Sequence, residues 1–358
     1  MFSGLESKSQ LLKVITNMKA VFLNGPSGAA ALTYGDRPEP EIEPGEVMLQ
    51  VRASALNHLD LNLPRGYRGP LPRIMGCDIA GEVVQISPGA DFGLKEGDRV
   101  LLDNRVKCGT CENCIQGMDQ YCINQKRLGV DRDGGHAEYV TAPAVNAYRI
   151  PDSMSFTEAA AIPIVGHTAW HCLVTQGQVR PWDDVLIHAA GSGVGSMGIQ
   201  IAKMMGARVI TTAGSNWKLE KAKELGASEA INYRETPNIS QRVKELTGGK
   251  GVDLVFDCVG ADVWEESLLC LKPGGRLVIT GVTSGARANM NLSILQGHPL
   301  HLMGSGGRSR RTFGDMMKMV NQGALRGIVG RVFPLEEVAE AHRVMEARDF
   351  FGKLVIES

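Results

Sequence analysis

The sequence lacks the features that would direct it to a membrane or to a nucleic acid. No apolar run approaches the roughly 20 residues that a membrane-spanning helix requires. The 38 Lys and Arg residues are balanced by 39 Asp and Glu residues, so no excess of positive charge favours a nucleic acid or an anionic lipid surface. The first seventeen residues contain two lysines and no continuous apolar core, unlike a signal peptide. We therefore expect a cytoplasmic protein with neither partner.

Internal repeats and low-complexity segments are absent too, and the 358 residues are enough for two domains. Up to about residue 148 the pattern is one of short strands between turn signals, for example at residues 47–52, 79–86 and 99–102. This pattern predicts a partly open β-barrel. After Pro151 strands and helices alternate, which predicts a doubly wound parallel sheet.

A glycine-rich turn marks the start of that second region. Residues 185–189 are mostly apolar and predict a buried strand, residues 199–205 have helical periodicity, and a second strand is expected at 207–212. The glycines between strand and helix allow a tight turn and the close approach of a phosphate pair. The sequence therefore predicts that a dinucleotide binds at Gly191, Ser192, Gly193, Val194 and Gly195.

Further strands are expected at residues 253–258, 275–280 and 300–303, which gives the parallel sheet six strands. The tail predicts helices at 312–321 and 335–347, then a strand at 352–356 that returns to the barrel. We therefore expect a barrel domain from residues 18–150 and 310–358 around a dinucleotide-binding domain of residues 151–309. The active site should lie between the domains, at the carboxyl ends of the parallel strands.

Half of the eight cysteines lie within fifteen residues, with the spacing C-x2-C-x2-C-x7-C. Disulfides are not expected in a reducing cytoplasm, and four thiolates match a closed tetrahedral zinc site. The sequence predicts one structural zinc per chain, because four sulfur ligands leave no open position for a substrate. The ligands are Cys108, Cys111, Cys114 and Cys122.

A barrel-like first part, a four-cysteine lobe and a Rossmann domain together resemble the medium-chain dehydrogenase/reductase superfamily, with a GroES-like barrel as the catalytic domain. Zinc alcohol dehydrogenases of that family bind a catalytic zinc through a Cys at Asn57, a His at Cys77 and a Cys that we place at Ala161. These substitutions remove the usual ligands. The chain is instead similar to the quinone oxidoreductase-like branch, which reduces activated double bonds.

The resemblance implies an NAD(P)H-dependent reductase that acts on a small electrophilic substrate such as an enone, a quinone or an enoyl thioester. It places Asn57 and Asp60 near the nicotinamide as catalytic candidates, and Thr168 on the same side of the cofactor. A neutral group such as Asn57 could stabilise an enolate oxygen. The implied cofactor-binding set also includes Cys258, Val259, Gly281, Val282 and Thr283.

NADPH is expected rather than NADH. The place after the second strand that normally carries an acidic residue for the ribose hydroxyls has no carboxylate. Ser215 and Lys218 can instead meet a 2′-phosphate, and Tyr233 is expected to flank it, as in similar reductases.

A homodimer, or a dimer of dimers, is expected because relatives pair the edge strand at 300–303 across a two-fold axis. Two other functions stay open. One is an alcohol or aldehyde dehydrogenase with an atypical metal site that uses Cys77 and Asp78. The other is an NADPH-binding protein with negligible turnover.

Overall fold

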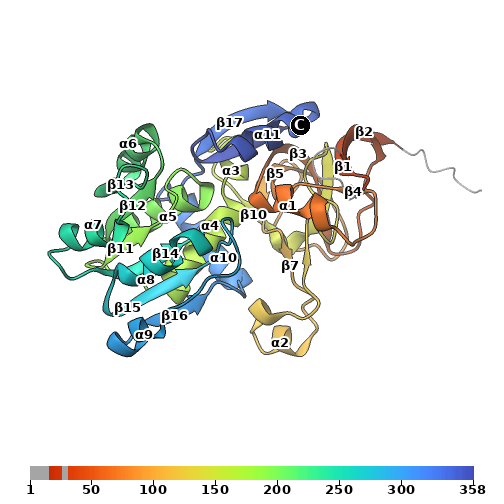
Figure 1. Ribbon diagram of the computed structural model, residues 1–358. Coiled ribbons are helices and arrows are strands. Elements are labelled where there is room, and N and C mark those ends of the chain that lie inside the picture. The colour runs from red at the N-terminus through yellow and green to blue at the C-terminus, as the bar shows by residue number, and fades with distance from the viewer. Residues whose placement is uncertain (1–15, 26–30) are drawn as a thin grey trace, which may run out of the picture.

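The computed structural model describes residues 16–25 and 31–358 (Figure 1). Almost all of the expected N-terminal extension, residues 1–17, lies outside the described residues. Strand β1 (Asn17–Leu23) begins one residue before the predicted first strand. Within the two described ranges, no helix has the length and apolar character needed to cross a membrane.

The second half of the chain forms a six-stranded sheet in which every neighbouring pair is parallel. The strand order is β13-β12-β11-β14-β15-β16, so the chain moves outward from β11 in one direction and then from β14 in the other. The predicted doubly wound Rossmann sheet is confirmed. Its strands are β11 (Asp184–Ile187), β12 (Arg208–Ala213), β13 (Glu229–Asn232), β14 (Val252–Asp257), β15 (Leu271–Ile279) and β16 (His301–Gly304).

Helices connect these strands and cover the sheet (Figure 1). The first of them can pack closely on the strands because of Gly198, where a Cβ would lie only 3.0 Å from the buried ring of Phe256. The helices are α5 (Gly193–Met204), α6 (Asn216–Leu225), α7 (Ile239–Leu246), α8 (Trp264–Leu269), preceded by the 3₁₀ turn η5 (Ala261–Val263), and α9 (Leu292–Gly297).

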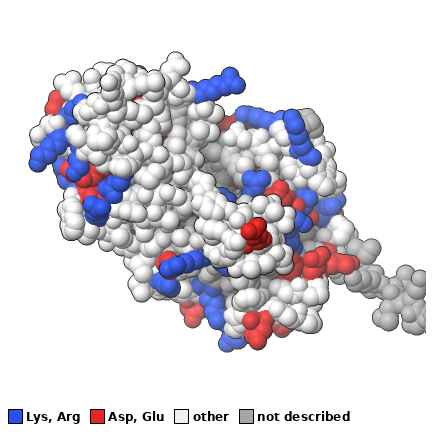
Figure 2. All heavy atoms as spheres, turned by 90° about the horizontal axis from the view of Figure 1, so that it is seen from below, with Lys and Arg blue, Asp and Glu red and all other residues white. Residues whose placement is uncertain are grey.

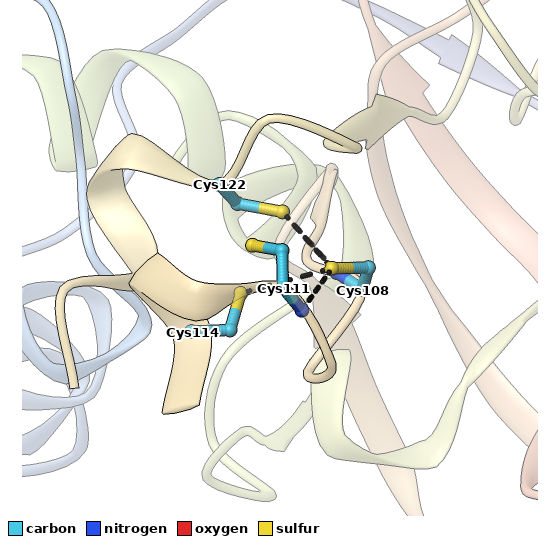
Figure 3. Close-up of side chains that lie close together, drawn as sticks. All are labelled: Cys108, Cys111, Cys114 and Cys122. Atoms are coloured by element: carbon cyan, nitrogen blue, oxygen red, sulfur yellow. Dashed lines mark hydrogen bonds between the residues drawn. The ribbon is translucent and has the colours of Figure 1, made fainter. Parts of the chain in front are cut away.

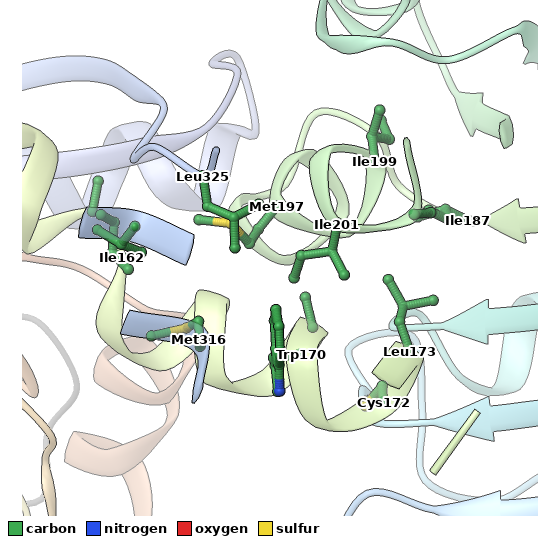
Figure 4. Close-up of a cluster of buried hydrophobic side chains, with 14 of the residues drawn as sticks. Ile162, Trp170, Cys172, Leu173, Ile187, Met197, Ile199, Ile201, Met316 and Leu325 are labelled. Carbon is green, nitrogen blue, oxygen red and sulfur yellow. The ribbon is translucent and has the colours of Figure 1, made fainter. Parts of the chain in front are cut away.

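Two helices lead from the barrel into the Rossmann domain. Helix α3 (Phe156–Ala160) begins with a capping box in which Ser155 and Glu158 satisfy each other's backbone N–H groups. Helix α4 (Pro163–Trp170) has a proline in its first turn and continues as the π-helical segment η4 (His171–Gln176). Buried side chains of α4, η4, α5 and α10 (Arg310–Asn321) pack together in one apolar cluster (Figure 4).

The first part of the chain forms two antiparallel-rich sheets, which confirms the GroES-like barrel. A seven-stranded sheet has the order β10-β6-β5-β3-β18-β17, with β9 also on β3; it includes the C-terminal strands β17 (Val329–Pro334) and β18 (Lys353–Glu357). A three-stranded sheet has the order β2-β1-β4. The remaining strands are β2 (Leu32–Pro38), β3 (Glu46–Ala55), β4 (Arg73–Ile74), β5 (Asp78–Ile86), β6 (Arg99–Leu102), β9 (Tyr139–Pro143) and β10 (Ala147–Arg149), with the 3₁₀ turn η3 (Ala144–Asn146) before β10.

The C-terminal strand returns to the barrel as expected. Strand β18 (Lys353–Glu357) pairs antiparallel with β3 and parallel with β17 (Val329–Pro334). The helix predicted at 335–347 begins as the 3₁₀ turn η6 (Leu335–Glu337) and continues as α11 (Val338–Ala347). Helix α10 begins at residue 310, the predicted boundary between the two domains, and packs with α4 and α5 in one cluster. The position of this domain boundary stays a prediction.

A small lobe projects from the barrel near the bottom of Figure 1. It contains β7 (Arg105–Val106), α2 (Glu112–Ile115), η2 (Asp119–Tyr121) and β8 (Lys126–Arg127). The lobe contacts the Rossmann side through Asp119, whose Oδ2 accepts the backbone N–H of Arg310 at 3.0 Å. On the face shown in Figure 2, small groups of acidic and basic side chains are scattered among uncharged ones.

Candidate functional site

The predicted glycine loop lies between the end of β11 and the start of α5. Ser192 caps the helix: its Oγ accepts the N–H of Gly195 at 2.9 Å and donates to the carbonyl of Ala189 at 2.8 Å. A Cβ at Gly195 would lie 2.2 Å from that carbonyl oxygen, so the turn requires glycine. The free N–H groups and the positive end of α5 form an anion site that fits a pyrophosphate.

The glycine loop also touches the last strand of the barrel. Gly352 donates its N–H to the carbonyl of Gly191 at 2.9 Å. A Cβ at Gly193 would lie 2.7 Å from Cδ of Lys353 and 3.0 Å from Cγ1 of Val165. The loop that would hold the cofactor therefore lies directly at the junction of the two sheets.

The three residues predicted to meet a 2′-phosphate follow strands β12 and β13. Ser215 is the N-cap of α6, and its side chain makes no capping hydrogen bond. Lys218 donates from Nζ to the carbonyl of Arg348 at 2.6 Å. Tyr233 reaches back across Gly214, where a Cβ would lie 2.5 Å from the tyrosine Oη. The structure thus gathers these residues at one end of the sheet.

Two arginines that sequence reasoning missed add positive charge beside Lys218. Burial, together with the charges of Arg234 and Arg348, lowers the pKa of Lys218, while Asp349 acts in the opposite direction. The side chain of Lys218 also covers the glycine loop, because a Cβ at Gly191 would lie 2.8 Å from its Cδ. These cations, together with the carboxylate of Asp349, lie beside the residues that the sequence predicts to meet a 2′-phosphate.

The other predicted cofactor residues lie just beyond β14 and β15. A Cβ at Gly281 would lie 2.0 Å from the carbonyl oxygen of Cys258, and Thr283 donates to the carbonyl of Val259 at 3.4 Å. Val282, between them, is 55% exposed and could contact a ligand. Thr168 lies apart on α4, buried, and its hydroxyl donates to its own helix at the carbonyl of Ile164.

A buried ion pair lies where the glycine loop meets the barrel. The ammonium of Lys353 is 2.8 Å from Oδ2 of Asp78, and it also donates to Oδ1 of Asn57 at 2.7 Å and to the carbonyl of Leu56 at 2.5 Å. Asn57 Nδ2 donates to the same Asp78 oxygen at 2.9 Å, and the N–H of Ile164 donates to the other at 2.7 Å. The ammonium and the carboxylate therefore have partners on every side.

The two predicted catalytic residues lie together at the start of α1 (His58–Gly66). Asn57 is the N-cap, and its N–H donates to Oδ2 of Asp60 at 2.7 Å as part of a capping box. Asp60 is fully buried, and its Oδ1 has no hydrogen-bond partner. Burial raises the pKa of Asp60 to about 6, against the opposing effects of the Asn57 N–H and the Lys353 charge. In the structure Asp60 accepts the backbone N–H of Asn57, and the catalytic role of both residues stays a prediction.

Sequence reasoning missed Lys353, although a lysine within an otherwise apolar strand was a signal that it needs a buried partner. It also placed the third ligand position of zinc relatives at Ala161. In the structure Ala161 packs beside Gly327, and the backbone N–H of Ile164 donates to Asp78, so the placement of that ligand position at Ala161 stays a prediction. Neither residue offers a thiolate, so the inference that this ligand is missing is unaffected.

The four predicted zinc ligands converge in the lobe (Figure 3). Their sulfur atoms all lie within 4.8 Å of one another, an arrangement that could hold a metal ion. The backbone N–H groups of Thr110 and Cys111 lower the pKa of Cys108 to about 5, which favours the thiolate that a metal needs. Over the described ranges, this is the only group of three or more His, Cys, Asp or Glu residues close enough to share a metal ion.

Comparison with known proteins agrees with this geometry. Residues 43–152 match the alcohol dehydrogenase GroES-like domain, and residues 193–322 match the zinc-binding dehydrogenase family. A quinone oxidoreductase of Salmonella typhimurium is 36% identical over 257 residues, covering 71% of this chain and 70% of the relative. A 2-haloacrylate reductase of a Burkholderia species is 31% identical over 331 residues, covering 87% and 91%.

A solved NAD-dependent alcohol dehydrogenase is 42% identical, with a TM-score of 0.91 over 95% of this chain and all of that chain. The chain belongs to the medium-chain dehydrogenase/reductase superfamily. It is therefore an NAD(P)-dependent oxidoreductase. As in other enzymes that use a Rossmann domain, the residues around the cofactor decide which chemistry follows.

We expect Asp60→Asn to flatten the dependence of stability on pH between about 4 and 6. The pKa of Asp60 is about 6 in the folded protein and 3.8 without the fold, so the folded state binds more protons in this window. The free energy of unfolding therefore falls as the pH rises through it, by at most about 3 kcal/mol for this group. Urea unfolding at pH 4.5 and pH 7 measures the difference.

Asp91→Asn, on an exposed loop residue, is the matched control and should keep the wild-type slope. Burial also raises the pKa of Asp103 to about 6. Both variants retain Asp103, so its contribution to the pH dependence of stability should be the same in each. Identical pH profiles for the wild type and Asp60→Asn would show that Asp60 is already ionised in the folded protein.

Proposed function

We propose that this enzyme is an NADPH-dependent reductase that transfers a hydride to an activated carbon–carbon double bond or a quinone, without a catalytic zinc. The observation that carries the proposal is the place of Lys353. Its ammonium donates hydrogen bonds to Asn57 and to Asp78, which stand in the regions of sequence that supply zinc ligands in the alcohol dehydrogenases. A fixed positive charge bonded to these oxygens opposes a second cation there.

The neighbouring donors also suit zinc poorly. Cys77 is buried, and burial raises its pKa well above the ordinary value, so the sulfur stays a protonated thiol. Asn57 offers an amide where a thiolate would be needed for this borderline-soft ion. The name of the quinone oxidoreductase relative and that of the 2-haloacrylate reductase relative support reduction as the reaction.

When bound, NADPH supplies the hydride to one carbon of the double bond, and a solvent proton at the neighbouring carbon completes a two-electron reduction. The chain's own contribution centres on Asn57. Lys353 holds the amide oxygen, which fixes the orientation of the side chain. One hydrogen of Nδ2 points to Asp78, and the other makes only a 3.4 Å contact with the carbonyl of Ala55. An enolate oxygen that displaced this long hydrogen bond would be stabilised by the second hydrogen.

An alcohol dehydrogenase with an atypical metal site is the second candidate, because a solved NAD-dependent alcohol dehydrogenase is 42% identical. The two functions differ in a direct assay. Purified enzyme should oxidise NADPH when given enones or quinones, and should not reduce NADP⁺ or NAD⁺ when given primary or secondary alcohols. Alcohol-dependent reduction of either nucleotide, with no enone or quinone turnover, would establish the second candidate.

For the cofactor, we propose NADPH held by Ser215, Lys218 and Tyr233, with Arg234 and Arg348 nearby. Lys218→Ala should lower kcat/KM for NADPH by about ten- to a hundredfold with little change for NADH, because a hydrogen bond to a charged group contributes roughly 1.5–3 kcal/mol. Lys221→Ala removes a similar charge from the same helix and is the control. An unchanged preference for NADPH in Lys218→Ala would refute the role of that lysine.

For the lobe, we propose one structural zinc bound by the four cysteines. Elemental analysis should find one zinc per chain, and Cys114→Ser should lower both zinc content and melting temperature because metal binding is linked to folding. Cys77→Ala is the control and should keep one zinc. Two zincs per chain in the wild type, with activity lost alongside the second, would show that the metal-free mechanism is wrong.

We also propose a homodimer formed through the edge strand β16. Pairing on its other side is absent within the described sheet, and Leu302 and the nearby α9 residue Leu292 are exposed. Leu302→Lys should shift the protein to the monomer in light scattering at micromolar concentration, because it places charge on the apolar face of the edge. Leu71→Lys, an exposed leucine of the barrel, is the control. A wild-type monomer would rule the dimer out.

A further inference from the structure

A group of three arginines lies where the lobe meets the start of α10. Arg105 belongs to β7, Arg308 precedes α10 and Arg310 opens it. The charge of Arg105 acts on Arg308 and on the buried thiol of Cys77. The same thiol is close enough to Lys353 to be affected by its charge. We call these three arginines the arginine cluster. Arg308 lies at the carboxyl end of the parallel sheet, where its Nη2 donates to Thr280, the residue before the predicted cofactor residue Gly281.

The guanidinium groups of the arginine cluster lack anionic partners. Arg308 donates from Nη2 to the Thr280 hydroxyl at 3.3 Å, and its Nε is buried without any hydrogen bond. The Nε of Arg310 is likewise buried and unpartnered. Within the described part of the chain, no carboxylate forms an ion pair with any of the three. The three arginines are partly buried as residues, but the two buried Nε atoms have lost hydration without gaining a hydrogen-bond partner, which is costly for a charged group.

The carboxylates nearby face backbone N–H groups instead. Asp103 is buried, and its Oδ1 accepts the N–H of Arg105 at 3.0 Å. Asp119 accepts the N–H of Arg310. The buried Lys107 lies in the same region, and its ammonium donates to the amide oxygen of Gln125. Two carboxylates are therefore found beside three arginines and one lysine. Among these Asp, Arg and Lys side chains the surplus of charge is positive, and a zinc ion bound by the four cysteine thiolates would add negative charge on the side of Lys107.

The histidines beside the cluster do not offset this surplus. Burial and the charges of Arg308 and Arg105 lower the pKa of His167, and burial and Arg308 lower that of His171 to about 4. Both rings stay neutral near pH 7. Burial and the charge of Arg105 also lower the pKa of Arg308 to about 10. The positive charge of Arg105 therefore makes the charged form of Arg308 less favourable.

The phosphates of the cofactor do not reach this place. They would lie after β11 and β12, whereas Arg308 adjoins Thr280, which directly follows β15. In the order β12-β11-β14-β15, the cluster is two strands from the glycine loop and three from Lys218. Neighbouring strands are about 4.8 Å apart, so the nearer separation is roughly 10 Å. Neither the described carboxylates nor the cofactor phosphates would therefore pair with these guanidinium groups.

We propose that the arginine cluster binds a carboxylate of the substrate, and that the enzyme reduces acceptors whose activated double bond carries such an acid group. The proposal rests on the proposed reductase function. A guanidinium group offers two parallel N–H donors that match a carboxylate, and Arg308 has its Nε free for this purpose. The anion would neutralise the surplus charge and hold the double bond beside Asn57.

The test compares trans-4-oxo-2-pentenoate with its methyl ester, which share one enone and differ in the charge of the acid group. Wild-type kcat/KM should be at least tenfold higher for the acid. Arg308→Gln should lower the ratio of acid to ester kcat/KM by about ten- to a hundredfold, and Arg105→Gln should act in the same direction. Arg308→Lys should recover part of the ratio. Arg242→Gln, on exposed α7, is the matched control.

Equal use of acid and ester by the wild type, or a ratio unchanged in both Arg308→Gln and Arg105→Gln, would overturn the proposal. Inhibition by inorganic phosphate and by succinate, each added as a competitor of the acid substrate, distinguishes a phosphate site from a carboxylate site. Stronger inhibition by phosphate than by succinate would overturn the assignment to a carboxylate. If neither the acid nor the ester is reduced, the proposed reductase function is wrong, and this result by itself does not decide whether the anion site exists. Succinate binding by calorimetry that is lost in Arg308→Gln would then still support the anion site, and no binding would refute it.

Discussion

The ion pair between Lys353 and Asp78 is the interaction on which the rest of the site depends. Both side chains are almost completely buried, so their loss of hydration must be offset by hydrogen bonds on every side. Those bonds come from strands β5 and β18, from the start of α1 and from α4. Removing one partner of such a pair typically costs about 3–5 kcal/mol, because a buried charge is left uncompensated.

The same lysine joins the two halves of the molecule. Its aliphatic stem lies against Gly193, where any Cβ would be too close, and its ammonium orients Asn57. The glycine loop therefore has Lys353 against one face. If the cofactor and the substrate bind as proposed, a change in the position of β18 would move the loop and the amide together and would couple cofactor binding to the geometry of the reaction.

Positive charge gathers at two places although the chain is almost neutral overall. One place is Lys218 with Arg234 and Arg348, and the other is the arginine cluster. Lys218 and its neighbours follow strands β12 and β13, whereas Arg308 adjoins the end of β15. At each place the named carboxylates are fewer than the cations, which under our proposals would attract the phosphate of the cofactor at one and a carboxylate of the substrate at the other.

Sequence alone determined the features whose residues are neighbours in the chain: the glycine turn between β11 and α5, the cysteine spacing of the lobe and the alternation of strands and helices. Each follows from local rules of turn geometry, metal ligation or periodicity. The tertiary structure decided the rest. Lys353 and Asp78 are 275 positions apart, and Arg308 reaches the site only because α10 folds back beside the lobe. No local pattern encodes such contacts, because they arise when separate strands and helices pack together.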